Sequence, residues 1–496
     1  MNDDQFQRLC SVCDSVLRSK LTKERIAIDW LHVLNEHPVH IDKYINLFNG
    51  MSSDTLRWAK SLAQSILQTM KCIKSKPMWH SSKKIPDRAD VIIISHLISE
   101  SQVGLEEDFY FGRLSESLQG KGLSTVVVLR DHTGGNLKKL SSKWPSSMAP
   151  RLFFSNSLSC REELLIRKHQ KEEASLLLKE AKLSSDDLKK RVLKKAASLA
   201  DSGSPIAMLR FYKQLEGLIE RLRPKTIIVT YEGHAWERLV FSAARNKVPN
   251  IRCIGYQHAI LFPRHHALKR ELGGGFDPDV ILTGGDVTRD ILLKDKSFMH
   301  TKVTTIGTHR QDTPNRTLTE KLSKNMVDSC LVIPDGNLCE CLTILKFSID
   351  VAKAAPNIHF IIRFHPLISF ETIVKADRKL EVLPDNLEVS QCSINEDFDR
   401  CRWALYRASG AAIRAVVDGL RPFYISLPHE LNIDPLYTLT DWKCVISTPK
   451  EFIEQARLDL KCNSSILENE LIKAREFCQS YFKPVDLDGF YYEIKA

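Results

Sequence analysis

A carboxylate and an imidazole follow an apolar run near the middle of the chain. The run 226–230, TIIVT, is typical of a buried strand, and Glu232 and His234 come shortly after it. The next segment, WERLVFSAAR, has a helical pattern. Glu232 and His234 are therefore expected on a loop at the carboxyl end of a strand, where side chains are placed to act on a bound ligand.

Glu232 is suited to glycosyl transfer in two ways. It can take the proton of an acceptor hydroxyl in an inverting reaction, or attack the anomeric carbon in a retaining one. The structural alternative is that the Glu232 carboxylate caps the following helix through its first-turn amides. Within that helix, Glu237 and Arg238 are expected to form an ion pair.

Histidines gather after the next apolar run. The run 251–255 is followed by Tyr-Gln-His258, and residues 264–266 read Arg-His-His. We expect His258 to hydrogen-bond the substrate and group it with Glu232 and His234 as the catalytic residues. The spacing of the histidines matches no zinc ligand set on a helix or turn, so no metal site is predicted.

The second half of the chain carries groups that suit a nucleotide. Residues 334–337, PDGN, lie between a strand and a helix, where the backbone N–H groups of Gly336 and Asn337 can receive phosphate. The next strand ends in Arg363, Phe, His365 and Pro366, which place a cation, an imidazole and a rigid ring together. These residues predict a donor-binding site, and the alternative is that His365 is a buried structural residue, because the run before it is strongly apolar.

Two further places can hold phosphate. Residues 407–412, RASGAA, join a strand to a helix, and the small Gly410 lets backbone amides and the Ser409 hydroxyl approach a phosphate closely. Tight packing between helix and sheet is the alternative for the small residues. Arg310 and Arg363 are candidates for neutralising a leaving phosphate, with a solvated surface position as the alternative for each.

The length and composition predict a folded protein with two cores. A chain of 496 residues is too long for one core, since a single core stops growing at roughly 250 to 300 residues. A hydrophobic fraction of 43% beside 27% charged residues is typical of globular proteins, which excludes the disordered and fibrous classes.

Apolar runs alternate with helical patterns in two series. We expect a helical extension over residues 1–80, a Rossmann-like domain over 88–315 with a charged helical insert near 161–200, and a second Rossmann-like domain over 328–480. This alternation predicts parallel sheets with crossover helices. The predicted fold class is therefore α/β, with the two domains facing across a cleft at the carboxyl ends of their strands.

Targeting and charge point to the cytoplasm and to anionic partners. No stretch reaches the roughly 20 apolar residues of a membrane span, and MNDDQFQRL lacks the plan of a signal peptide. The thirteen cysteines lack the regular spacing of a disulfide framework, which fits reduced thiols. The net charge of +10 favours anionic partners, which are nucleic acid, a nucleotide-sugar or an acidic membrane surface, and no motif for specific nucleic-acid binding is present.

Three of these pieces together resemble a known family. Glu232-Gly233, His365-Pro366 and Ser409, in that order, resemble the bacterial sialyltransferase and Kdo-transferase group of GT-B enzymes. In that group an acid followed by glycine supplies the catalytic carboxylate, a His-Pro motif holds CMP, and a Ser/Thr motif binds its phosphate. The segments YEGHAWER and IGYQHA also resemble surface-carbohydrate biosynthesis proteins, over residues 90–440.

The resemblance implies a metal-independent glycosyltransferase of bacterial surface polysaccharide assembly, in capsule, O-antigen or lipopolysaccharide. Its CMP-activated donor substrate, and no other cofactor, would supply a Kdo-like or sialic-acid-like ulosonic sugar. The acceptor would be a glycan or lipid-linked glycan at the cytoplasmic face of the inner membrane, where the enzyme would bind peripherally. Alternatives are a UDP- or GDP-sugar donor, a CDP-glycerol-type donor, and a non-enzymatic basic scaffold for membrane or RNA.

Overall fold

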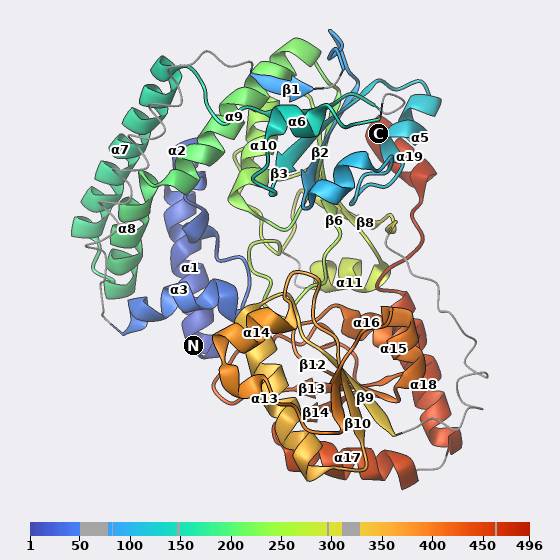
Figure 1. Cartoon of the computed structure of the whole chain (residues 1–496). Coiled ribbons are helices and arrows are strands. Elements are labelled where there is room, and N and C mark those ends of the chain that lie inside the picture. The colour runs from blue at the N-terminus through green and yellow to red at the C-terminus, as the bar shows by residue number, and fades with distance from the viewer. Residues whose placement is uncertain (50–77, 82, 146–148, 295–296, 310–327, 462–463) are drawn as a thin grey trace.

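The chain folds into two parallel α/β domains, which lie one above the other in Figure 1. The computed structural model describes residues 1–49, 78–81, 83–145, 149–294, 297–309, 328–461 and 464–496. Helices cover both faces of each sheet, so the inner strands are buried on both sides and consist of nearly continuous apolar residues.

The sheet of the first domain has the strand order β1-β4-β3-β2-β5-β6-β7-β8 in the described part of the chain. Only the pair of β1 with β4 is antiparallel. The strands are β1 (Trp79–Ser81), β2 (Val91–Leu97), β3 (Thr125–Asp131), β4 (Arg151–Phe154), β5 (Thr226–Thr230), β6 (Arg252–Gln257), β7 (Val280–Thr283) and β8 (Lys302–Thr305). The order reverses between β2 and β5, which makes the carboxyl ends of these two strands a topological switch point.

The sheet of the second domain is parallel throughout, in the order β11-β10-β9-β12-β13-β14. Its strands are β9 (Ser329–Ile333), β10 (His359–Ile362), β11 (Leu387–Val389), β12 (Trp403–Tyr406), β13 (Arg421–Ile425) and β14 (Cys444–Ile446). Its switch point lies between β9 and β12. Both sheets thus contain the strand order of a Rossmann fold, and the prediction of two Rossmann-like domains is confirmed.

The helices follow the strands as crossover connections or form the extension and the insert. In the first domain they are α5 (Leu114–Gly120), α6 (Leu137–Ser141), α9 (Gly203–Leu222), α10 (Ala235–Lys247) and α11 (Asp286–Lys294). In the second they are α13 (Leu338–Ala354), α14 (Phe370–Ala376), α15 (Ile394–Arg400), α16 (Ala411–Val417), α17 (Pro449–Lys461) and α18 (Ser464–Gln479). The expected charged insert forms α7 (Cys160–Leu183) and α8 (Asp187–Ala200).

The N-terminal extension packs against the first domain. It contains α1 (Asp3–Ser19), α2 (Lys23–Ile26) and α3 (Pro38–Phe48), while residues 50–77 lie outside the described part. Asn2 and Gln5 form a capping box that starts α1. The apolar face of α1 joins one hydrophobic core with α8, α9 and α10. The two thiols Cys10 and Cys13 lie on this face, and burial raises the pKa of each well above its usual value.

The last residues of the chain return from the second domain to the first. The backbone of residues 480–486 exchanges hydrogen bonds with residues 284–308, for example from the Lys483 N–H to the Gly284 carbonyl at 2.9 Å. Gly307 has a φ of +85°, and a Cβ there would lie 2.0 Å from the Pro484 carbonyl oxygen. Beyond this crossing, α19 (Leu487–Lys495) packs Phe490 against Tyr256 of β6. Residues 480–496 therefore complete the core of the first domain.

Candidate functional site

The loop that joins β5 to α10 holds Glu232 and His234 at the switch point of the first sheet. Its shape depends on Gly233, which has a φ of +84°. A Cβ at Gly233 would lie 2.4 Å from the carbonyl oxygen of Ala267, so the position excludes any side chain on two grounds. The glycine after Glu232 is thus required by local geometry.

Glu237 holds this loop from inside the first turn of α10. Its carboxylate accepts the backbone N–H groups of Glu232 at 2.9 Å and His234 at 2.8 Å. Burial raises the pKa of Glu237 to about 7, although the charge of His234 opposes this rise. Capping is therefore the task of Glu237, and the Glu232 carboxylate is left to interact with other groups.

The predicted ion pair between Glu237 and Arg238 is wrong. Successive residues of a helix point about 100° apart, so the two side chains diverge. Arg238 is fully buried, pairs with Asp277, and donates to the Ala267 carbonyl at 2.7 Å. It fixes the segment that packs against Gly233.

Glu232 lies between two histidines. His234 Nε2 is 3.4 Å from one carboxylate oxygen of Glu232, and His258 Nε2 is 3.8 Å from the other. The Glu232 and His234 side chains are 30% and 35% exposed, whereas the His258 side chain is 10% exposed. A ligand can therefore reach the carboxylate and the His234 imidazole, while His258 approaches the carboxylate from within the protein.

These contacts fix the charge of the group. Burial acts to raise the pKa of Glu232, but the hydrogen bond from His234 and the charge of His258 outweigh it and hold the pKa well below its usual range. Burial lowers the pKa of His234, but Glu232 and Glu237 outweigh it and raise that pKa above its usual value. Glu232 is thus ionised at neutral pH, which is the form that a base or a nucleophile requires.

Further histidines that sequence analysis did not assign to the site lie close to this group. His265 is buried, and burial lowers its pKa to about 4. His96, on β2 at the same switch point, lies 2.9 Å from the Thr230 hydroxyl oxygen through Nε2 and 2.8 Å from His132 through Nδ1. In the sequence, the position of His96 near the end of an apolar run was the signal that could have placed this residue at the site.

The N-terminal extension also reaches the site, through residues 35–40, NEHPVH. Glu36 accepts the Arg264 backbone N–H at 2.5 Å, and His37 Nε2 lies 3.1 Å from a carboxylate oxygen of Asp335 in the second domain. The pKa of His40 falls to about 4 through burial and neighbouring cations, which include His234. This segment, which ends in the first turn of α3, therefore links the two domains near His234, a role that the helical pattern of the extension did not reveal.

The predicted donor residues lie on loops of the second domain. The Asn337 side chain caps α13 by accepting the N–H groups of Cys339 and Glu340. Gly336 faces His365, because a Cβ at Gly336 would lie 3.1 Å from His365 Nδ1. His365 and Pro366 are exposed. The structure therefore brings Gly336 and His365 together at the carboxyl ends of β9 and β10.

Arg363 has a structural task in this arrangement. Its guanidinium lies 3.0 Å from a carboxylate oxygen of Asp397 and donates to the Cys392 carbonyl at 2.6 Å. The Asp397 side chain is fully buried, so Arg363 provides a counter-charge that this carboxylate needs. Arg310, the other cation expected to neutralise phosphate, lies outside the described residues.

Ser409 and Gly410 lie where the first domain covers the second. Ser409 is 8% exposed, and a Cβ at Gly410 would lie 3.4 Å from the Ile260 side chain of the loop after β6. Nearby, Phe262 of the same loop shares an apolar cluster with Ala408 and Ile433. The carboxyl ends of β6 and β12 thus face each other across the domain junction.

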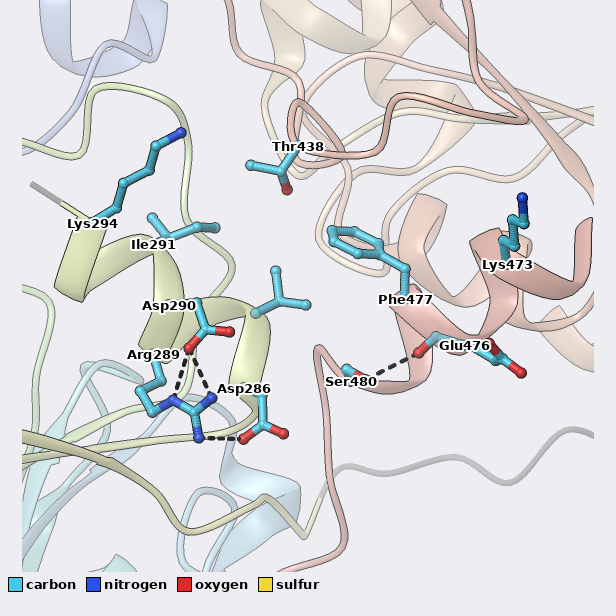
Figure 2. Close-up of a pocket in the computed structure, with 11 residues that line it drawn as sticks. Asp286, Arg289, Asp290, Ile291, Lys294, Thr438, Lys473, Glu476, Phe477 and Ser480 are labelled. Carbon is cyan, nitrogen blue, oxygen red and sulfur yellow. Dashed lines mark hydrogen bonds and ion pairs between the residues drawn. The ribbon is translucent and has the colours of Figure 1, made fainter. Parts of the chain in front are cut away.

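A separate cavity of about 600 Å³ opens between α11 and α18 (Figure 2). Val287 and Ile291 form one apolar wall and Phe477 the other, while Arg289 forms ion pairs with Asp286 and Asp290 at the rim. None of the residues selected from the sequence lines this cavity.

The similarity of this chain to known proteins lies in its fold. No family model and no curated protein matches the sequence. Similar solved structures include the kitacinnamycin glycotransferase (12% identity, 80% of this chain and 96% of that chain, TM-score 0.45) and MurG of Acinetobacter baumannii (11%, 82% and 99%, 0.46). MnaA of S. aureus, solved with UDP, is also similar (11%, 82% and 96%, 0.45).

Two tandem Rossmann-like domains with facing carboxyl ends and a C-terminal return to the first domain define the GT-B type of fold. Identities of 11 to 12% with these structures do not assign a role to any residue of this chain. Each role is therefore inferred from the geometry of the chain itself. Within the described residues, no cluster of histidine, cysteine and acidic side chains has the geometry of a metal site. No helix in the same residues is long and apolar enough to span a bilayer.

Proposed function

We propose that this protein is a glycosyltransferase that uses a nucleotide-activated sugar, with Glu232 as the residue that acts on the reacting centre. The observation that carries the proposal is the ionised Glu232 carboxylate, held between His234 and His258 at the switch point of the first sheet. Ligands of open parallel sheets bind at such points. The carboxylate is partly exposed, so a sugar hydroxyl or an anomeric carbon can approach it.

The two histidines keep Glu232 ready for the reaction. In an inverting transfer, Glu232 takes the proton of the acceptor hydroxyl while that oxygen forms a bond to the anomeric carbon and the bond to the donor phosphate breaks. In a retaining transfer, Glu232 itself forms the bond to the anomeric carbon. Both routes require the carboxylate in its ionised form, which His234 and His258 favour.

The donor that we propose is a CMP-activated ulosonic sugar, and the acceptor is a glycan or lipid-linked glycan. The reasons are the Glu232-Gly233, His365-Pro366 and Ser409 pattern and the position of Gly336 beside His365. The carboxylate of an ulosonic sugar also suits a site surrounded by imidazoles, since these can donate hydrogen bonds to it. Peripheral contact with an anionic membrane and a cytoplasmic location belong to the same proposal.

Thermal unfolding with a panel of CMP, CDP, UDP and GDP tests the donor. A nucleotide at 100 times its dissociation constant should add about 2.7 kcal/mol to the native state. Stabilisation by CMP alone supports the ulosonate donor. A response to UDP or GDP replaces the donor but keeps the transferase, a response to CDP favours transfer of a phosphoglycerol-like group, and no response to any of them favours a scaffold.

We predict that His365→Ala and Gly336→Ala each weaken CMP binding by about tenfold, a change of about 1.4 kcal/mol. The new Cβ at Gly336 would press on the His365 imidazole, so both variants act on one side chain. The double variant should therefore bind no more weakly than His365→Ala. Gly120→Ala, where a Cβ meets nothing within 4 Å, is the matched control for titration calorimetry. If the effects of the two substitutions add in the double variant, they do not act through the same His365 side chain.

The pH dependence of kcat/KM should change in His234→Gln. His234 lowers the pKa of Glu232, so its removal lets burial raise that pKa. The acid limb of the profile reports protonation of Glu232, and we expect it to move to higher pH by about one unit or more. His300→Gln, an exposed histidine in another loop, should leave the limb in place. If the acid limb stays in place in His234→Gln, His234 does not control the ionisation of Glu232.

A further inference from the structure

The helix α7 lies at the outer edge of the molecule, with α8 between part of it and the body (Figure 1). Its sequence, CREELLIRKHQKEEASLLLKEAKL, mixes acids and bases nearly evenly. The structure, however, separates these charges between the two sides of the helix. This separation gives its exposed face a chemistry that the composition hides.

The acids of α7 that point inward are neutralised by the rest of the protein. Glu163 pairs with Arg210 at 2.5 Å, and Glu173 pairs with Lys20 at 3.1 Å and with the fully buried Arg25 at 2.6 Å. Arg25 also pairs with Glu180 at 2.6 Å. Three of the five acids in the helix therefore contribute no free negative charge to its outer face.

The exposed face of α7 is cationic and apolar. Its exposed charged residues are five bases and one acid, Arg161, Lys168, Lys171, Lys179, Lys182 and Glu172. Exposed leucines lie among them, namely Leu164 (61%), Leu165 (49%), Leu176 (37%), Leu178 (46%) and Leu183 (87%). A soluble surface helix normally turns such leucines toward a core.

The leucines and the cations form lines along the helix. Leu165, Leu176 and Leu183 are separated by eleven and seven residues, which are close to three and two turns of about 3.6 residues. Arg161, Lys168 and Lys179 follow the same separations in the opposite order. At about 1.5 Å per residue, the 24 residues of α7 give this face a length of about 36 Å.

We propose that the outer face of α7 binds the surface of an anionic lipid bilayer, with its leucines in the interfacial layer and its lysines against lipid headgroups. Charge complementarity favours this occupant, because lysines and an arginine alternate with leucines on one face. The mode of binding is interfacial, since α7 itself carries too many charges to cross a bilayer. The inference deepens the proposed peripheral membrane contact by naming the surface that makes it, and it does not depend on glycosyl transfer.

Co-sedimentation of the full-length protein with lipid vesicles tests the proposal. We expect binding to vesicles that contain phosphatidylglycerol in phosphatidylcholine, weak binding to phosphatidylcholine alone, and loss of binding as salt rises. Equal binding to both vesicle types, or no binding to either, would overturn the proposal. Binding to RNA without binding to anionic vesicles would also overturn it and assign the face to nucleic acid.

Two sets of substitutions locate the binding face. Lys168→Gln, Lys179→Gln and Lys182→Gln together should weaken vesicle binding by about 100-fold, since each cation near the surface contributes about fivefold. Leu165→Ser, Leu176→Ser and Leu183→Ser together should weaken it by at least roughly tenfold. Leu458→Ser with Leu460→Ser, which alters two exposed leucines of α17, is the matched control and should bind as the wild type does. Binding unchanged in both α7 variants would refute the assignment, and circular dichroism confirms that each variant is folded.

Discussion

Replacing Glu232 with glutamine is expected to lower kcat/KM for glycosyl transfer by about 10² to 10⁴-fold, the range that loss of an acid–base group produces. Glutamine has nearly the same shape but cannot take a proton or attack an anomeric carbon. Initial rates with the donor that stabilises the protein measure the change. An activity close to that of the wild type in a folded Glu232→Gln protein would exclude Glu232 from the chemistry.

Controls distinguish a catalytic loss from a structural one. Glu232→Gln should remain folded and keep its affinity for the donor nucleotide, because the backbone N–H of residue 232 remains bound to Glu237. Glu107→Gln, an exposed acid on another loop of the same domain, should keep full activity. A covalent glycosyl adduct on Glu232, detected by mass spectrometry, would assign the nucleophile role and exclude the base.

The second large effect is expected at Gly233. Gly233→Ala must place a Cβ 2.4 Å from the Ala267 carbonyl oxygen in a backbone with a φ of +84°. The left-handed conformation and the overpacking together should lower the free energy of unfolding by about 3 kcal/mol. The substitution would also displace Glu232 and His234, so activity should fall even at temperatures at which the variant remains folded. Urea unfolding and initial rates measure the two effects.

Gly273→Ala separates the two causes of this destabilisation. Gly273 has a similar φ of +81°, but a Cβ there meets nothing within 4 Å. It should therefore show only the conformational cost, about 1 kcal/mol. Equal destabilisation by the two variants would show that contact with Ala267 does not explain the requirement for glycine at position 233.

The central strands were predictable from the sequence, because a strand buried on both faces must be apolar along its whole length. The run 226–230 forms β5 with the bounds expected from the sequence alone. The short strands β1, β4, β11 and β14 were not predicted. Each has only three or four residues, which is too few for periodicity to separate a strand from a loop.

The Glu232 loop was predictable because local rules determine it. The strand β5 ends, Gly233 follows, and α10 begins, all within a few residues. The contribution of His37, His40 and Glu36 was not predictable, since they lie about 200 residues away and reach the site only through packing of the extension. The same holds for Arg238, whose partner Asp277 is 39 residues distant. Long-range pairing of charges leaves no pattern in a single sequence.

The return of residues 480–496 to the first domain relates the order of synthesis to the order of folding. These residues are made after the whole second domain, yet they line the core beside β6 and pair with the backbone near Gly285 and Gly307. A nascent chain that has just released its first domain from the ribosome therefore carries an unfinished core. Final consolidation of that domain must wait until the second domain has emerged, so the protein matures as a single unit.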